Sequence, residues 1–239
     1  MADTSALALE TPSSEAVYRM LRNRIMTCEL SPGQVLTERE SAVELGLALA
    51  PVHDVLTRLV QDGLVQTVSP SVYRITPLTL KSVNDLLTVW TLLGPEMAAL
   101  GTSRADPQEA AKLRQLMAEG NAVLSGPPDR DRVVRFVDIA EQVFGLVAVA
   151  SRNERLIEVY RSLAGETWRV LAMILLAAEC VDTLLAAGVT WGSTIEPRDG
   201  VTATRIVRDV TVATHMSAIR VLSDRPESSG DGVVLPLRR

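Results

Sequence analysis

Acid–base chemistry in this sequence would depend on very few side chains. His215 is the only histidine after position 80, and it is the one side chain there that ordinarily titrates near neutrality. Glu179 follows a long apolar stretch, so Glu179 and His215 are the candidate catalytic acid and base if both face one cavity. The alternative is that both lie at the surface, where histidines and carboxylates are usually found. No Ser-His-Asp spacing, Gly-rich phosphate loop or cysteine cluster is present.

A second group of residues could bind a small molecule. Aromatic residues make up only 3% of the chain, so large side chains on otherwise aliphatic segments are the candidate walls of a cavity. Two of them, Phe144 and Trp168, could equally be ordinary core residues. We expect no cofactor. We also expect no metal site, because the chain has only two histidines and imidazole is a usual ligand of transition metals such as zinc, copper, iron and nickel. The candidate ligand-binding residues are Trp90, Phe144, Trp168, Met173 and Trp191.

The charge distribution argues against general nucleic-acid affinity. The formal net charge is −5, and residues 15–80 contain six arginines and no lysine against seven carboxylates. No apolar run reaches the roughly 20 residues of a membrane-spanning helix. Two cysteines, Cys28 and Cys180, cannot build a disulfide framework. We therefore expect a cytoplasmic protein that is not bound to a membrane.

The spacing of apolar residues defines the elements that would position these side chains. Within residues 15–76 it predicts three short helices, the second opened by a Thr37/Glu40 capping box and closed by Gly46, followed by a hairpin over 64–68 and 72–75. This order is typical of a winged helix-turn-helix. Beyond a linker at 77–80, residues 81–223 predict an all-α bundle of six or seven helices, with segments at 79–103, 106–124, 130–150, 153–187 and 200–222. Residues 188–200 are expected to break it, and residues 1–14 and 224–239 to be a disordered N-terminus and a flexible tail. The fold class is thus mostly α.

Three stretches make the sequence specific enough to resemble a known family. They are "VYRMLRNRIMTCELSPGQVLTERESAVELG", "PVHDVLTRLVQDGLV" and "ASRNERLI". Over residues 15–220 the chain resembles the FadR branch of the GntR family of bacterial transcriptional regulators. The resemblance implies a homodimer that binds operator DNA through its N-terminal domain and a small acid or metal through its bundle. The DNA-binding candidates are then Arg39, His53, Arg58 and Arg74.

The sequence departs from this family at both expected sites. Where members carry Val-Ser-Arg-Thr-Pro-Val-Arg-Glu, this chain has Leu47 to Asp54, "LALAPVHD", without either arginine or hydroxyl. Each lost bidentate contact would cost about 1–3 kcal/mol of discrimination. The places of two metal ligands fall on Ala140 and Phe144, and the others near 197–198 and 219–220. The arginine that would grip an acidic effector falls on Trp90.

Three functions follow from these departures. The main prediction is a repurposed protein that has lost operator binding and uses its cavity as an enzyme on a mostly apolar small molecule, in a cofactor-free cyclisation or isomerisation of specialised metabolism. The alternative is a ligand-responsive transcriptional regulator of the GntR family that reads a divergent operator mainly by shape and through Arg39, Arg58 and Arg74. A second alternative is a protein that binds the small molecule without turning it over.

Overall fold

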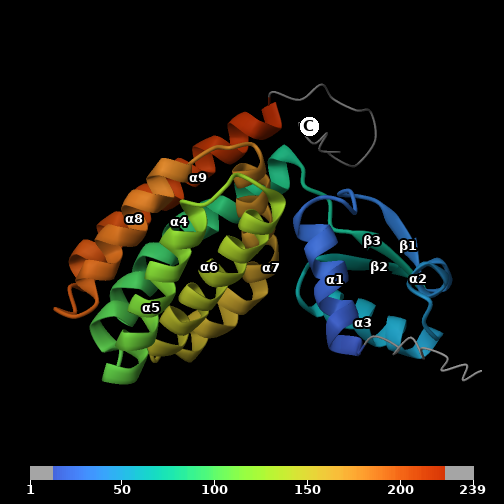
Figure 1. The fold of residues 1–239 in the computed structure, drawn as a ribbon, viewed down its shortest axis with the longest axis horizontal. Coiled ribbons are helices and arrows are strands. Elements are labelled where there is room, and N and C mark those ends of the chain that lie inside the picture. The colour runs from blue at the N-terminus through green and yellow to red at the C-terminus, as the bar shows by residue number, and fades with distance from the viewer. Residues whose placement is uncertain (1–12, 224–239) are drawn as a thin grey trace, which may run out of the picture.

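The computed structural model describes residues 13–223, which form two parts lying side by side (Figure 1). The first part is a small α/β unit and the second an all-α bundle, so the predicted fold class is confirmed. The elements of the first part are α1 (Ser14–Met26), β1 (Val35–Thr37), α2 (Glu38–Leu45), α3 (Leu49–Gln61), β2 (Val65–Ser69) and β3 (Val72–Ile75). Those of the second are α4 (Leu80–Arg104), α5 (Pro107–Leu124), α6 (Arg130–Ala150), α7 (Glu154–Leu176), α8 (Val181–Thr194) and α9 (Gly200–Ser223).

The three helices of the first part form where the apolar spacing predicts them. At the start of α2, the backbone N–H of Glu40 donates to Oγ1 of Thr37 at 3.1 Å, and that hydroxyl donates to the Glu40 carboxylate at 2.8 Å. Gly46 ends α2 at φ 64°, in the left-handed region that suits glycine. The sequence signals for this helix are therefore confirmed at both ends.

The sheet has one strand more than the sequence predicts. The hairpin of β2 and β3 is confirmed, but β1 pairs antiparallel with the other edge of β3, so the strand order is β1-β3-β2. Val35 lies opposite Arg74 and Thr37 opposite Val72. A three-residue strand has too few side chains to show an alternating pattern, so it was not recognisable without its partner.

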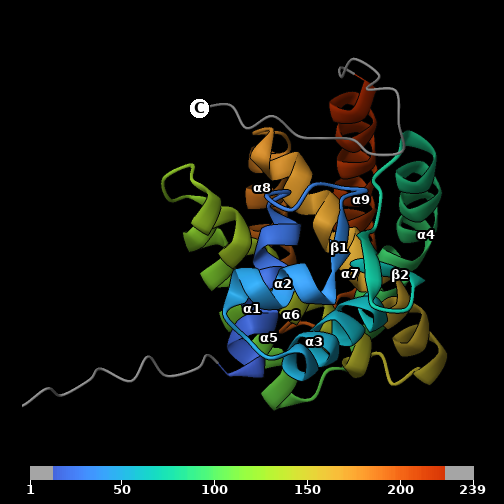
Figure 2. The same ribbon diagram turned by 90° about the vertical axis from the view of Figure 1, so that its right-hand side faces the viewer.

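The described part of the bundle has six helices, and α4 packs along α9 on one side of it (Figures 1 and 2). The predicted single helix over 153–187 is wrong. It is divided into α7 and α8 by a turn in which Ala178 and Cys180 have φ of 58° and 62°. The expected break at 188–200 is also partly wrong, because α8 continues to Thr194. Neither glycine nor proline marks the turn at 177–180, so local composition could not reveal it.

The predicted disordered N-terminus at 1–14 overlaps the described part of the chain only at Ser13 and Ser14. Ser13 caps α1 by accepting a hydrogen bond from the backbone N–H of Ala16 at 3.2 Å, and Ser14 begins the helix. The expectation of disorder is therefore wrong for these two residues. The expectations for residues 1–12 and for the tail at 224–239 lie outside the described part of the chain.

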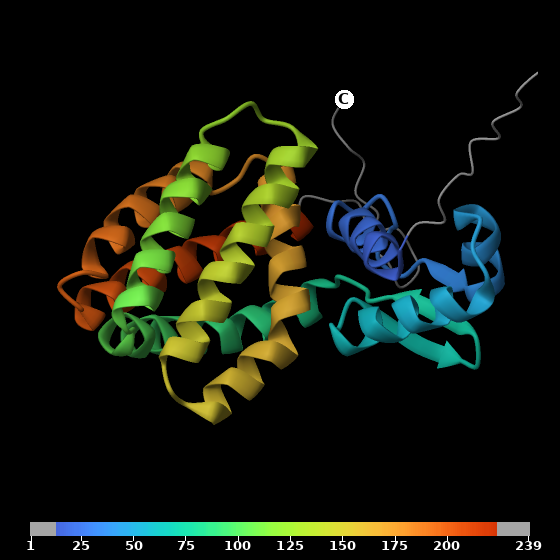
Figure 3. The same cartoon turned by 60° about the horizontal axis from the view of Figure 1, so that its bottom comes forward.

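The two parts meet where α1 and the end of α3 contact α6 and α7. Gly165 of α7 lies against the backbone carbonyl of Asp62, directly after α3, with no space for a side chain. Arg22 of α1 forms ion pairs with Asp138, at 2.7 Å, and with Glu141, both of α6. Figure 3 shows α3 running from this contact out to an end that lies away from the bundle. The geometry leaves the start of α3 accessible.

Candidate functional site

An apolar cavity lies inside the bundle, with walls contributed by all six helices, α4 to α9. Its volume is about 120 Å3. Among the described residues that line it, none has a titratable side chain. The cavity is therefore suited to holding a neutral molecule and has no group of its own for acid–base chemistry.

Four of the five predicted ligand-binding residues form one aromatic cluster in the cavity wall. The ring of Phe144 lies 5.3 Å from Trp90, 5.4 Å from Trp168 and 5.3 Å from Trp191, measured between centroids. These separations, with tilted rings, are those of favourable aromatic pairs. Trp191 is fixed further, because its indole N–H donates to Oγ1 of Thr102 at 3.1 Å. The cluster gives the cavity a rigid aromatic wall.

The other three predicted residues do not line the cavity. Met173 is fully buried on α7 but faces away from it. The Glu179 carboxylate, in the turn before α8, accepts hydrogen bonds from Arg220 at 2.9 Å and from Ser217 at 3.2 Å. His215 lies 3.1 Å from the side-chain oxygen of Asn84 on α4. The predicted acid and base therefore belong to polar contacts between elements, outside the cavity.

The sequence analysis missed the polar side chains of the cavity. Thr167, Thr211 and Thr214 line it, but each hydroxyl donates to a backbone carbonyl of its own helix, at 2.9–3.0 Å. Asn121 also lines it, beside Gly188 of α8. A threonine or asparagine on an amphipathic helix is normally a surface residue, so no signal in the sequence distinguished these four.

Two positions that the family resemblance assigned to metal ligands do lie in the cavity wall. They hold Ala140 and Phe144, neither of which can bind a cation. Across residues 13–223, no group of three or more His, Cys, Asp or Glu side chains is arranged to hold a metal ion. The wall at this place is made of hydrocarbon.

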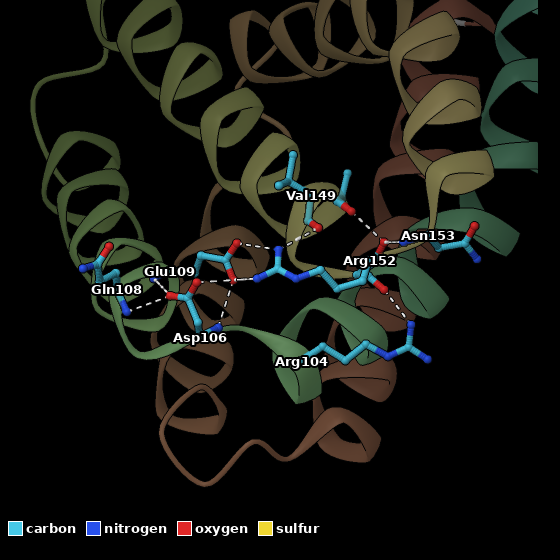
Figure 4. A network of polar contacts seen from close by, with 9 residues as sticks. Arg104, Asp106, Gln108, Glu109, Val149, Arg152 and Asn153 are labelled. Carbon is cyan, nitrogen blue, oxygen red and sulfur yellow. Dashed lines mark hydrogen bonds and ion pairs between the residues drawn. The ribbon is translucent and has the colours of Figure 1, made fainter.

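The "ASRNERLI" stretch has a structural role at the end of the bundle (Figure 4). Arg152, with φ 53°, forms two parallel hydrogen bonds of 2.7 Å with the Glu109 carboxylate at the start of α5. Arg104 donates to the backbone carbonyl of Ser151 at 2.6 Å, and Asn153 caps α7. These contacts join the α4–α5 and α6–α7 connections, and their residues are not part of the cavity wall.

A second candidate site is the exposed surface of α3. Leu49 and Ala50 are exposed in its first turn, and His53 follows one turn later with 58% of its side chain exposed. Nδ1 of His53 lies 2.8 Å from the Glu38 carboxylate, which also accepts a hydrogen bond of 2.8 Å from the Tyr73 hydroxyl. The hydrogen bond to Glu38 raises the pKa of His53 and lowers that of Glu38. His53 is thereby held in place and favoured in its cationic form.

The three arginines predicted to bind DNA differ in how free they are. Arg39 is exposed on α2 and forms no ion pair with any residue of the described range. Arg58 is engaged, with a bond of 2.6 Å to Glu15 and its guanidinium 3.5 Å from the centre of the Tyr18 ring. Arg74 lies on β3, partly buried. Arg39 is thus the most available of the three for a phosphate.

Helices that could cross a membrane were sought among residues 13–223, and none is both long and apolar enough.

Two family models together match most of the chain. The model described as "Bacterial regulatory proteins, gntR family" matches residues 13–71, and the FCD domain model matches residues 85–212. The first covers α1 to α3 together with β1 and β2 and ends just before β3, and the second covers most of the bundle that holds the cavity. The two matches therefore assign both candidate sites to recognised domains.

Curated relatives are named as transcriptional regulators. The chain is 28% identical over 133 residues to the Nta operon transcriptional regulator of Aminobacter aminovorans, covering 56% of this chain and 61% of that protein. It is 34% identical over 55 residues to the transcriptional repressor RspR of Escherichia coli, covering 23% and 24%. The matches to the first relatives span between about a fifth and three fifths of their lengths.

Solved structures share the fold. E. coli McbR/YncC superimposes with a TM-score of 0.66 over 83% of this chain and 93% of that one, at 16% identity. A putative GntR transcriptional regulator from Rhodococcus superimposes with a TM-score of 0.59 over 89% and 99%, also at 16% identity. At this level of identity the likeness concerns the fold alone.

These comparisons overturn the main functional prediction. The expectation of an enzyme, a cyclase or isomerase of specialised metabolism that has lost operator binding, is wrong, since the matched families and relatives are regulators. The doubt about DNA binding is likewise not supported. A charge count over the whole domain is a weak argument against DNA binding, because such binding depends on the few side chains that face the DNA.

Proposed function

Because the chain belongs to the GntR family of bacterial regulatory proteins, in its FadR-type branch, we propose that it is a DNA-binding transcriptional regulator controlled by a small molecule in its bundle. One observation carries this proposal. Helix α7 lines the cavity on one face and contacts the helix-turn-helix part on another. A molecule in the cavity therefore has a direct mechanical path to α3.

The cavity wall indicates the chemistry of the effector. Its lining residues offer aromatic and aliphatic surface, the amide of Asn121 and no charge, which favours a neutral and mostly apolar molecule. A dry cavity of about 150 Å3 is known to hold benzene, and this one measures about 120 Å3. We expect a ligand of one small ring, or a larger one if the helices separate to admit it.

The path from cavity to DNA-binding part runs through consecutive residues of α7. Trp168 lines the cavity, and the next residue, Arg169, is completely buried and donates from Nη1 to the backbone carbonyl of Thr76, after β3. Burial lowers the pKa of Arg169 to about 10. A ligand that displaces Trp168 would move Arg169 with it, and so bias the position of the winged part.

We further propose that the protein acts as a homodimer. Helix-turn-helix regulators bind two half-sites about one turn of DNA apart, and one copy contacts only one of them. Light scattering on the purified protein gives its mass directly. A monomer that persists when operator DNA is added would contradict this part of the proposal.

DNA binding is tested by selecting duplexes from a random library with the purified protein and measuring affinity at several salt concentrations. Arg39→Ala should weaken binding to the selected duplex and reduce the salt slope by about one unit, because a phosphate contact is lost. Arg155→Ala, which removes an exposed arginine of α7, is the matched control and should bind as the wild type does. The proposal is refuted if no duplex is enriched.

Effector binding is tested with toluene as the probe. Trp90, Trp168 and Trp191 all line the cavity, so its occupation should change their fluorescence and raise the thermal stability. If the fluorescence and the melting temperature both stay unchanged in saturated toluene, a small apolar effector is excluded.

A further inference from the structure

The first turn of α3 is free of the contacts that hold the rest of that helix. The buried residues of α3 are Val52, Val55, Leu56 and Leu59, and the chain directly after the other end of α3 lies against Gly165 of the bundle. Leu49 is 54% exposed and Ala50 is also exposed. Figures 1 and 3 show this turn at the side of the winged part that lies away from the bundle. No other described element covers it.

The position of this turn determines what it can meet. The second helix of a helix-turn-helix enters the major groove, and its N-terminal residues contact the base edges. Ala48, the residue before α3, has no side chain that could accept a hydrogen bond from the first backbone N–H groups of the helix. These N–H groups can therefore donate to a DNA phosphate. If α3 docks in this way, Leu49 and Ala50 point to bases.

Leucine and alanine have no hydrogen-bonding group in their side chains, so they cannot recognise the donor and acceptor pattern of a base pair. The major groove offers one apolar feature, the C5-methyl group of thymine. A leucine that is half exposed in the free protein would lose water contact against that methyl group, which is favourable. Cytosine carries only a hydrogen atom at C5, and a purine has no methyl group at this edge, so neither would give Leu49 the same apolar contact.

We propose that Leu49 is a specificity residue that selects thymine in the operator half-site through contact with its C5-methyl group. The inference rests on the proposed function, because it requires that α3 enters the major groove. Ala50 extends the same apolar surface by one methyl group. His53, held by Glu38, lies one turn after Leu49 and is the first residue of α3 with a hydrogen-bonding side chain.

The test replaces the thymines of the selected duplex, one at a time, by deoxyuridine, which lacks the methyl group and keeps every hydrogen-bonding atom. For the wild-type protein we expect affinity to fall about three- to fivefold at one or two positions, the equivalent of one buried methyl group. Leu49→Ala should bind the thymine duplex more weakly and lose most of its preference for thymine over deoxyuridine at those positions.

Leu92→Ala is the matched control, because Leu92 is 72% exposed on α4 of the bundle and undergoes the same truncation. It should keep the full preference for thymine. The proposal is overturned if deoxyuridine has no effect on the wild type, or if Leu49→Ala keeps the wild-type preference. Failure to select any duplex would instead refute the regulator function, so the two failures are distinguishable.

Discussion

Replacing Gly165 by alanine tests the contact between the bundle and the end of α3. A Cβ atom at this position would stand 3.0 Å from the carbonyl carbon of Asp62, and closer still to its oxygen, so the winged part would have to move. Overpacking of this kind costs about 1–3 kcal/mol. Alanine gains about 1 kcal/mol over glycine inside a helix. The net expectation is a loss of about 0–2 kcal/mol in the free energy of unfolding.

Gly145→Ala is the matched control in the middle of α6. Its Cβ would meet the Tyr160 hydroxyl at 3.7 Å, which is ordinary contact, so only the helical gain of up to about 1 kcal/mol remains. The two variants should therefore differ by roughly 2 kcal/mol, or about 4–8 °C in melting temperature for a chain of this size. Far-UV circular dichroism during heating measures both. Equal melting temperatures for the two variants would refute the close packing of α7 on α3.

Three further predictions concern the coupling, the α3 surface and the cavity. Arg169→Met should change the free energy of unfolding by less than about 1 kcal/mol, because losing the bond to Thr76 is offset by removing a buried charge. If Arg169 couples the cavity to the winged part, toluene should change the DNA affinity of the wild type and should change that of this variant less. Anisotropy titrations that show the same effect of toluene on both proteins would contradict the coupling. The raised pKa of His53 means that its bond to Glu38 stabilises the protein fully below about pH 6.5 and is lost as the pH rises through the raised value. The melting temperatures of wild type and His53→Gln should therefore differ most just below about pH 6.5 and converge as the pH is raised. A gap that does not vary with pH would show that the pair is not formed. Ala140→Leu should fill part of the cavity and abolish the fluorescence response to toluene, and a response equal to that of the wild type would place the toluene site elsewhere.

The aromatic wall shows how far the sequence could identify a site. Aromatic residues are rare in this chain, so Trp90, Phe144, Trp168 and Trp191 could be nominated from composition, and the fold brings them together. Met173 lies on the same helix as Trp168 but faces elsewhere. Composition can select a residue type, but the direction in which a side chain points depends on how each helix is rotated against its neighbours.

The sequence by itself determined most of the helices, the caps of α2 and the family, because each of these depends on residues close together in the chain. Thr37, Glu40 and Gly46 set the bounds of α2 within ten residues. Only the tertiary structure decided the pairing of β1 with β3, the turn at Ala178 and Cys180, and the place of His215 beside Asn84 rather than in the cavity. In each of these three cases the outcome depends on packing between segments that are distant in the sequence, for which no local pattern exists.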